Sequence, residues 1–201
     1  LSVVGLTIIL LVVFCAIFAP FIAPYPEDAG AVVNYSQASQ APSLEHIFGT
    51  DTSGRDLFSR ILFSFRGALI MGVGCLAVVV PVGGILGLIA GYYNGRFISN
   101  FIMRLADVFL ALPALILVMC VSSIMTPSLM NAMLALCVSW WPWYTRLVNN
   151  IVVSTRNEVY IRSAEVLGAS NTHILFKQIL PNALGPILTK VTLDMGWAIM
   201  A

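Results

Sequence analysis

The stretch GALIMGVGCLAVVVPVGGILGLIAGYYNG, residues 67–95, has no charged side chain and carries a glycine at every fourth position from 83 to 95. A helix needs roughly 20 mainly apolar residues to cross a bilayer, so this stretch predicts a membrane span at about 68–91. Glycines four residues apart share one helix face, which in lipid lets two backbones approach closely. We therefore expect Gly83 and Gly87 to pack against another helix, whereas the two later glycines fit a helix end equally well.

Composition extends this interpretation to the whole chain, which is 59% hydrophobic and 9% charged with a mean hydropathy of +0.94. Soluble domains carry about a quarter charged residues. Residues 1–26 and 108–145 also lack charges, and Thr126-Pro127-Ser128 breaks the second run, which is too long for one crossing. The sequence predicts an all-α, polytopic membrane protein with five spans. They lie at about 1–23, 68–91, 102–125 and 129–148, and from 187 onward.

The chain opens at Leu1 and closes at Ala201 inside apolar runs, so we expect it to lack both ends of a longer protein. The first run is long, has no basic residues before it and is followed by prolines, which favours a span over a signal peptide. The four cysteines all fall in apolar runs, where packing is the expected role.

Lysine and arginine are distributed unevenly over the connecting segments. Segments 24–66 and 126–128 contain three, whereas 92–104 and 146–190 contain seven. Cytoplasmic loops of membrane proteins carry the excess of these residues. We therefore expect the long polar segment 149–186 to be cytoplasmic and segment 24–66 to be extracytoplasmic.

A helix–glycine–helix unit is predicted at 155–181, inside the segment expected to be cytoplasmic. Thr155 and Glu158 have the spacing of a capping box, and Gly168 suits the residue that ends the first helix. Ser170 offers an N-cap for a second helix that would run until Pro181.

The first of these helices has two contrasting faces. Its charged side holds Glu158, Arg162 and Glu165, and the opposite side holds a small and apolar strip, Tyr160, Ala164 and Leu167. Such a helix can dock into a groove of another protein. It can equally be a well-folded loop, and the residues alone do not choose between the two.

The run YIRSAEVLGAS at 160–170, with ILPN at 179–182, resembles the EAA loop of binding-protein-dependent ABC importer permeases. The resemblance implies a coupling helix that docks into a cleft of a cytoplasmic ATPase subunit. The family's Glu-Ala-Ala falls on Arg162-Ser163-Ala164, so only its last alanine matches, whereas the later Gly and Leu-Pro both match. The coupling residues carried over are Glu158, Tyr160, Arg162, Ser163, Ala164, Leu167, Gly168, Ala169, Ser170, Leu180 and Pro181.

A second run, FGTDTSGRDLFSR at 48–60, resembles the F-G-T-D-x-x-G-R-D-x-x-S-R segment that precedes the second span in the dipeptide and oligopeptide branch of that family. By itself it is a capped turn that leads into an amphipathic helix, with Asp51 or Ser53 as the expected N-cap. A phosphate-binding loop is not expected, because no G-x-x-x-x-G-K-[ST] is present. The motif residues are Gly49, Thr50, Asp51, Gly54, Arg55 and Asp56.

The resemblance covers nearly the whole chain and implies a type I ABC importer transmembrane fold. It implies an N-terminal span with an extracytoplasmic segment at 1–66, and a transmembrane domain at 67–201. The implied function is a permease subunit in the bacterial plasma (inner) membrane, with a di- or oligopeptide as cargo and nickel or glutathione as alternatives. The implied partners are a second homologous permease, an extracytoplasmic solute-binding protein and two ATPase subunits that bind ATP and Mg, with no cofactor or metal on this chain.

The sequence argues against two other classes of function. An ion-coupled carrier or channel would favour discontinuous helices or ionisable groups deep in the spans, of which the sequence shows few. Asp107, Lys190 and Asp194 are expected near the interface, and Trp140–Trp143 are expected in an aromatic belt at the cytoplasmic end of their span. A membrane enzyme is not expected, because His46 and His173 fall on opposite sides and are interpreted as surface residues. The net charge of +1 gives no footprint for nucleic acid.

Overall fold

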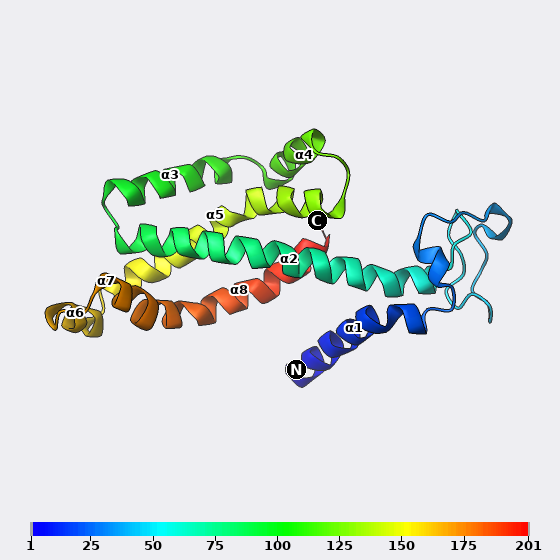
Figure 1. The fold of residues 1–201 in the computed structure, drawn as a ribbon, viewed down its shortest axis with the longest axis horizontal. Helices are drawn as coiled ribbons and strands as arrows, with labels where there is room; N and C mark the ends of the chain where they lie inside the picture. The colour runs from blue at the N-terminus through cyan, green and yellow to red at the C-terminus, as the bar shows by residue number, and fades with distance from the viewer. Residues whose placement is uncertain (1, 201) are drawn as a thin grey trace. The chain divides into compact units, whose positions relative to one another are not determined.

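The computed structural model describes residues 2–200, and helices form most of this range (Figure 1). The only strand-like pairing in the described part of the chain is one antiparallel bridge between Thr50 and Asp56. The elements are, in order, α1 (Ser2–Ile22), η1 (Pro26–Ala29), η2 (Tyr35–Gln37), α2 (Leu57–Tyr92), α3 (Phe97–Ala111), α4 (Ala114–Ile124), α5 (Leu129–Arg156), α6 (Val159–Val166), α7 (Asn171–His173), the π-helical η3 (Ile174–Ile179) and α8 (Leu180–Met200).

The chain divides into two compact units, and the division falls inside α2 between Ile70 and Met71. The first unit has a small core of Ala19, Ala23 and Leu62. The second unit contains two buried clusters along α2, α5 and the elements after α5. One is Cys75, Leu76, Val79, Leu136, Cys137 and Tyr144, and the other is Leu88, Tyr92, Val148, Val152, Ile161, Ile174, Ile179, Ala183 and Ile187.

In the second unit, the glycine face of α2 lies directly against α5. A Cβ added at Gly83 would lie 2.6 Å from the carbonyl oxygen of Trp141, and one at Gly87 would lie 2.6 Å from that of Thr145. Gly91 belongs to the same contact, since its Cβ would lie 2.6 Å from the Cβ of Val152. Gly95 instead has a φ of +80° and open space around it, and it lies in the turn that follows the end of α2 at Tyr92. Of the two later glycines, Gly91 therefore packs against α5, whereas Gly95 belongs to the helix end.

We expect Gly87→Val to destabilise the second unit by about 1–3 kcal/mol, because the new side chain must push two backbones apart. Gly84→Val is the matched control, since a Cβ at Gly84 meets nothing within 4 Å. Both changes remove a glycine from the same helix, so they share the same change in helix propensity. Thermal unfolding of the detergent-purified protein checks this, and equal midpoints for the two variants would contradict the close contact.

The predicted third span is broken rather than continuous. Its residues form α3 and α4, which meet at an angle of 89° (Figure 1). Pro113 lacks a backbone N–H, and the residue before it, Leu112, has extended backbone angles of φ −86° and ψ 135°. The break expected at 126–128 is confirmed, because α4 ends at Ile124 and α5 begins at Leu129.

Within residues 2–200, two helices are long and apolar enough to cross a membrane individually, Val3–Ile22 of α1 and the whole of α2. The broken α3–α4 pair supplies a third if it is counted as one span. Helices α5 and α8 are long enough to cross a membrane, but they are not sufficiently apolar to count as spans by composition. The predicted fourth and fifth spans therefore stay predictions.

The helix of the predicted fourth span extends further than expected, because α5 continues to Arg156 without interruption at Pro142. Trp140 and Trp143 consequently lie near the middle of α5, and their place in an aromatic belt at a membrane interface stays a prediction. The second helix of the 155–181 unit also continues past Pro181 into α8. Pro181 is the second residue of α8, directly after the π-helical turn, and a proline is tolerated in the first turn of a helix.

Candidate coupling site and the FGTDxxGRD motif

The link between α5 and α6 differs from the predicted capping box. Thr155 lies inside α5, and Glu158 is itself the N-cap of α6, with no hydrogen bond from its side chain. The expected capping box is therefore wrong, because α5 uses Thr155 for its own last turn. The carbonyl oxygens of Ser154 and Thr155 accept hydrogen bonds from the backbone N–H of Asn157, the C-cap of α5.

The turn between α6 and α7 has the geometry expected at Gly168. Gly168 has a φ of +83°, which a residue with a side chain adopts only at a cost. Its N–H donates to the carbonyl of Glu165, and the N–H of Ala169 donates to the carbonyl of Ala164, both at 3.0 Å. These two bonds form a Schellman motif. Ser170 then caps α7, accepting a hydrogen bond from the backbone N–H of His173 at 3.3 Å.

The sequence places Tyr160, Ala164 and Leu167 on one face of the helix, but in the structure these three side chains differ in contacts and exposure. The Tyr160 hydroxyl accepts a hydrogen bond from Asn182 Nδ2 of α8 at 2.8 Å, and Ala164 is half-buried. Leu167 is 86% exposed. The fully buried residue of α6 is Ile161, in a cluster with Ile174 and Ile179 of η3.

The most exposed apolar side chains of α6 and its C-cap form what we call the apolar tip: Val159, Val166 and Leu167. Their exposed fractions are 78%, 87% and 86%. Val159 and Val166 are seven residues apart and therefore share a helix face, on which Arg162 and Ser163 also lie. Sequence reasoning missed the two valines, because valine on a short helix is normally a core residue.

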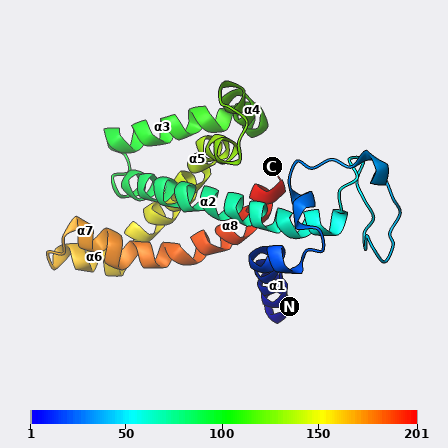
Figure 2. The same cartoon turned by 45° about the vertical axis from the view of Figure 1, so that its right-hand side comes forward.

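A polar cluster joins α6 and α7 to the ends of α2 and α5, which lie beside them at one end of the second unit (Figures 1 and 2). The Arg156 guanidinium donates to the carbonyl oxygen of Tyr92 and lies 4.6 Å from the centre of the Tyr92 ring. It also pairs with Glu165 of α6 at 4.0 Å. The Tyr92 hydroxyl donates to Asn171 Oδ1 of α7 at 2.6 Å. We call Tyr92, Arg156, Glu165 and Asn171 the joint.

Sequence reasoning did not find the joint. Tyr92 lies 64 residues before Arg156 and 79 before Asn171. The available signal was topological: the predicted second and fourth spans both end on the side where segment 149–186 was expected.

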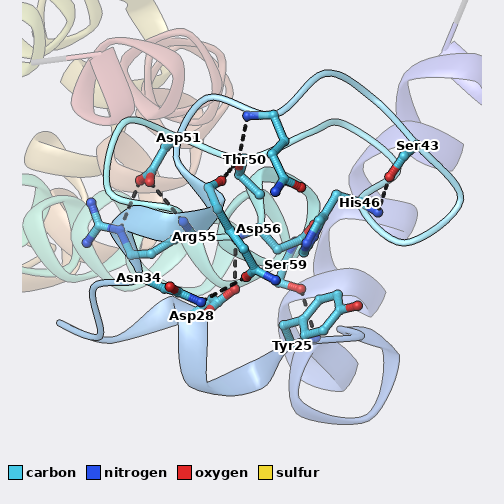
Figure 3. A network of polar contacts seen from close by, with 12 residues as sticks. Tyr25, Asp28, Asn34, Ser43, His46, Thr50, Asp51, Arg55, Asp56 and Ser59 are labelled. Atoms are coloured by element: carbon cyan, nitrogen blue, oxygen red, sulfur yellow. Dashed lines mark hydrogen bonds and ion pairs between the residues drawn. The ribbon is translucent and has the colours of Figure 1, made fainter.

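In the first unit, the FGTDxxGRD motif helps to fold segment 24–56 onto the start of α2, and Figure 3 shows the polar contacts of its Thr50, Asp51, Arg55 and Asp56. Gly54 has a φ of +75°, and a Cβ there would lie 1.7 Å from the carbonyl oxygen of Asn34. Gly49 has a φ of +74°, and its Cβ would lie 2.4 Å from the carbonyl oxygen of Gln40. Thr50 fixes the same part of the loop, because its hydroxyl donates to the carbonyl of Gln37 and accepts from the N–H of Gln40.

The helix that follows the motif is capped by Asp56, and not by Asp51 or Ser53 as the sequence predicted. Asp51 accepts hydrogen bonds from the N–H groups of Ser53 and Arg55, so it closes the turn rather than capping α2. The N-cap of α2 is Asp56, whose Oδ2 accepts from the N–H of Ser59 at 2.8 Å. The N–H of Asp56 donates in turn to Asp28 Oδ2 at 2.8 Å.

His46 is buried, and its expected place on the surface was wrong. Its exposed fraction is 3%, its Nδ1 lies 3.0 Å from Asp56 Oδ1, and its ring packs on Tyr25 at 4.9 Å between centroids. Burial of Asp56 favours its protonated form, but hydrogen bonds from Ser59 and His46 outweigh this and lower its pKa. His173, in contrast, is exposed, as expected.

We expect Asp51→Asn to loosen segment 34–59 by about 2 kcal/mol at neutral pH. Burial opposes ionisation of Asp51, but hydrogen bonds from the Arg55 and Ser53 backbones, together with the Arg55 side chain, lower its pKa from 3.8 to about 2. A lowered pKa contributes stability that is complete above 3.8 and is lost as the pH falls through about 2. Hydrogen exchange of this segment in the full-length protein should be roughly 30-fold faster in the variant at pH 7.

This difference in exchange should shrink between pH 5 and pH 2. A difference that stays constant over this range would show that the ionisation of Asp51 does not stabilise the turn. Glu27→Gln is the control, because Glu27 is an exposed acid in the same segment.

Together, the long apolar helices define this chain as a polytopic α-helical membrane protein, and an exposed helix–glycine–helix unit lies at one end of its second unit. The model of the family "Binding-protein-dependent transport system inner membrane component" matches residues 83–201, and that of the "N-terminal TM domain of oligopeptide transport permease C" matches residues 1–42. The chain belongs to the family of binding-protein-dependent transport system inner membrane components, with the type I ABC importer transmembrane fold.

Named relatives align along essentially the whole chain. It is 42% identical over 200 residues, all of the chain, to the dipeptide transport system permease protein DppC of Alkalihalophilus pseudofirmus. It is 36% identical, again over all of the chain, to the probable D,D-dipeptide transport system permease protein DdpC of Escherichia coli. It is 35% identical over 99% of the chain to the oligopeptide transport system permease protein OppC of Bacillus subtilis. The chain spans just under two thirds of the length of these relatives: 64%, 66% and 64%.

Proposed function

We propose that this chain is a permease subunit of an ATP-driven importer of di- or oligopeptides in a bacterial plasma membrane. The relatives named as dipeptide and oligopeptide permeases support the cargo. We further propose that segment 149–186 is cytoplasmic and segment 24–66 extracytoplasmic, and that residues 1–66 and 67–201 are the two functional parts.

The observation that carries this proposal is the apolar tip. An apolar surface exposed to water is unfavourable in isolation and marks an interaction site. Here it sits on a short helix that is fixed by a Schellman motif at one end and by buried Ile161 underneath. A helix presented in this way fits a groove on a partner. In our proposal that partner is a cytoplasmic ATPase subunit, and the carried-over loop residues from Glu158 to Pro181 shape the docking unit.

The complete importer would contain this chain, a second homologous permease, two ATPase subunits and an extracytoplasmic solute-binding protein. ATP and Mg would bind the ATPase subunits, and this chain would contribute no catalytic group. Closure of the ATPases would move α6 and α7, and the joint would pass this movement to α2 and α5. The motif of the first unit would brace the extracytoplasmic end of α2.

Two observations favour an ion-coupled carrier as a second candidate. The α3–α4 pair is discontinuous, and the Lys190–Asp194 ion pair lies inside α8. Both features occur in carriers. The family favours ATP as the energy source, because its members are components of binding-protein-dependent systems.

Uptake of a radiolabelled dipeptide by cells that carry the whole system separates these candidates. We expect uptake to stop when the phosphate-binding lysine of the ATPases is replaced, and to continue when an uncoupler collapses the proton gradient. The reverse result would support the carrier. Excess glutathione or nickel should leave uptake unchanged, and inhibition by either would reassign the cargo.

A further inference from the structure

The second unit contains a cavity of about 710 Å³ between α4, α5 and α8. Three tryptophans line it, Trp140, Trp143 and Trp197, and Lys190 and Asp194 contribute the charged part of its wall. Sites for small organic ligands occupy roughly 300–1,000 Å³, with mainly apolar walls and a few placed polar groups. This cavity has that size and that composition.

The cavity is lined by the start of α4, the middle of α5 and the second half of α8. Trp140 is eleven residues after the start of α5 and sixteen before its end, so about 16 Å and 24 Å of helix separate it from the two ends. Lys190 is ten residues, or about 15 Å, after the start of α8. The ion pair therefore lies almost three turns into α8, and its interfacial position stays a prediction.

Ionisable groups inside a membrane span mark substrate pathways by default, and this pair lies in α8, the predicted fifth span. The Lys190 ammonium lies 3.0 Å from Asp194 and faces the Trp143 and Tyr144 rings at 6.0 and 5.5 Å. Among residues 2–200 it makes one hydrogen bond, to Asp194, although an ammonium has three N–H donors. The neighbouring Tyr144 is 1% exposed, and its hydroxyl has no partner in this part of the chain.

We propose that this cavity binds a short peptide with free ends during transport, with Lys190 holding its carboxylate and Asp194 its ammonium group. A zwitterion presents one charge of each sign, as the pair does, so the site stays neutral both when empty and when occupied. The spare N–H groups of Lys190 bind the carboxylate, and the remaining lone pairs of Asp194 accept from the ammonium. The tryptophans cover the peptide backbone and side chains. This inference rests on the proposed peptide transport and assigns its site within this chain.

Tryptophan fluorescence of the full-length permease, assembled with its partner subunits but without the solute-binding protein, tests the site directly. Titration with dialanine should give a saturable change. Dialanine acetylated at its amino end or amidated at its carboxyl end should require roughly ten- to a hundred-fold higher concentrations, because each lacks one charge-assisted contact. Equal potency of the blocked and free peptides, or no saturable change, would overturn the proposal.

The double variant Lys190→Met with Asp194→Leu distinguishes binding from a purely structural ion pair. Replacing both partners of a buried pair by apolar residues is commonly tolerated by the fold, so assembly should persist. The dialanine response should disappear, and a full response would overturn the proposal. The control is Leu188→Met with Thr192→Val, on the opposite face of α8, which should keep the response. If the double variant fails to assemble, the series of blocked peptides on the unaltered protein still decides.

A measurement of dipeptide uptake by the unaltered system tests the proposed transport function separately from the proposed binding site. Dipeptide uptake without any fluorescence response would leave peptide transport intact and remove only this site. Absence of dipeptide uptake would remove the proposed function itself.

Discussion

Val166→Glu should reduce dipeptide uptake to background and prevent co-purification of the ATPase subunits. Val166 is 87% exposed and makes no contribution to the core, so the permease itself should fold with a change within about 0.5 kcal/mol. The effect arises in the complex, where an apolar groove on the ATPase would have to accept a buried carboxylate without a partner. Burying an unpaired charge costs far more than a surface substitution. The measurement is affinity purification of the full-length permease, followed by detection of bound ATPase.

Leu44→Glu is the matched control for this prediction. Leu44 is a fully exposed aliphatic residue in segment 24–66, which we place on the other side of the membrane. The same change in chemistry at that position should leave both uptake and co-purification intact. If Val166→Glu behaves like Leu44→Glu, the apolar tip does not dock an ATPase. If Leu44→Glu alone releases the ATPases, the proposed orientation of the chain is inverted.

The sequence predicted the helical class and the break at 126–128 because those features depend on local composition and on proline chemistry. The turn at Gly168 was predictable for the same reason: the helix termination signal is contained in a few adjacent residues. The close packing of Gly87 against another helix could also be predicted from the sequence, because a repeated glycine face in a membrane helix commonly serves helix–helix contact. The partner helix could not be read from the pattern.

The errors have a common physical origin in contacts between distant segments. Thr155 and Glu158 have capping-box spacing, but α5 continues because Val148 and Val152 remain in its core contact with α2. The burial of His46 depends on Asp56 and Tyr25, which approach it only after segment 24–56 folds over α2. Pattern rules count neighbours along the chain, and these outcomes depend on neighbours in space.

The candidate site shows the same division. The carried-over loop residues lie in the same segment as the apolar tip, yet the tip is formed by Val159 and Val166 together with Leu167, and the joint is formed with Tyr92. Deriving either from sequence would require knowing that Ile161 points into the cluster with Ile174. Once that buried residue is fixed, the helical period places Val159 and Val166 outward.

Arg156→Met should uncouple ATP hydrolysis from transport while the ATPases remain bound, which is the opposite pattern to that of Val166→Glu. The Arg156 guanidinium contacts both the carbonyl oxygen and the ring of Tyr92 in α2, and it pairs with Glu165 of α6. Methionine keeps much of the apolar stem of arginine but loses the guanidinium, so α6 keeps its exposed tip and loses its polar links to α2 and α5. We expect peptide-stimulated ATPase activity and uptake to fall at least about ten-fold, corresponding to about 1.4 kcal/mol of lost coupling.

Arg96→Met is the matched control for Arg156→Met. Arg96 also lies near a tyrosine ring, that of Tyr93 at 5.5 Å, but no hydrogen bond or ion pair links its side chain to α6 or α7 in the described chain. Its replacement should leave coupling unchanged. Tyr92→Phe offers a graded step, since it removes only the 2.6 Å hydrogen bond to Asn171 and should weaken coupling by a smaller factor. Because the three variants keep the apolar tip, co-purified ATPase should be equal in all of them. If Arg156→Met retains full uptake, movement of α6 must reach the spans through the remaining links, which are the Tyr92–Asn171 and Tyr160–Asn182 hydrogen bonds and the Ile161–Ile174–Ile179 cluster.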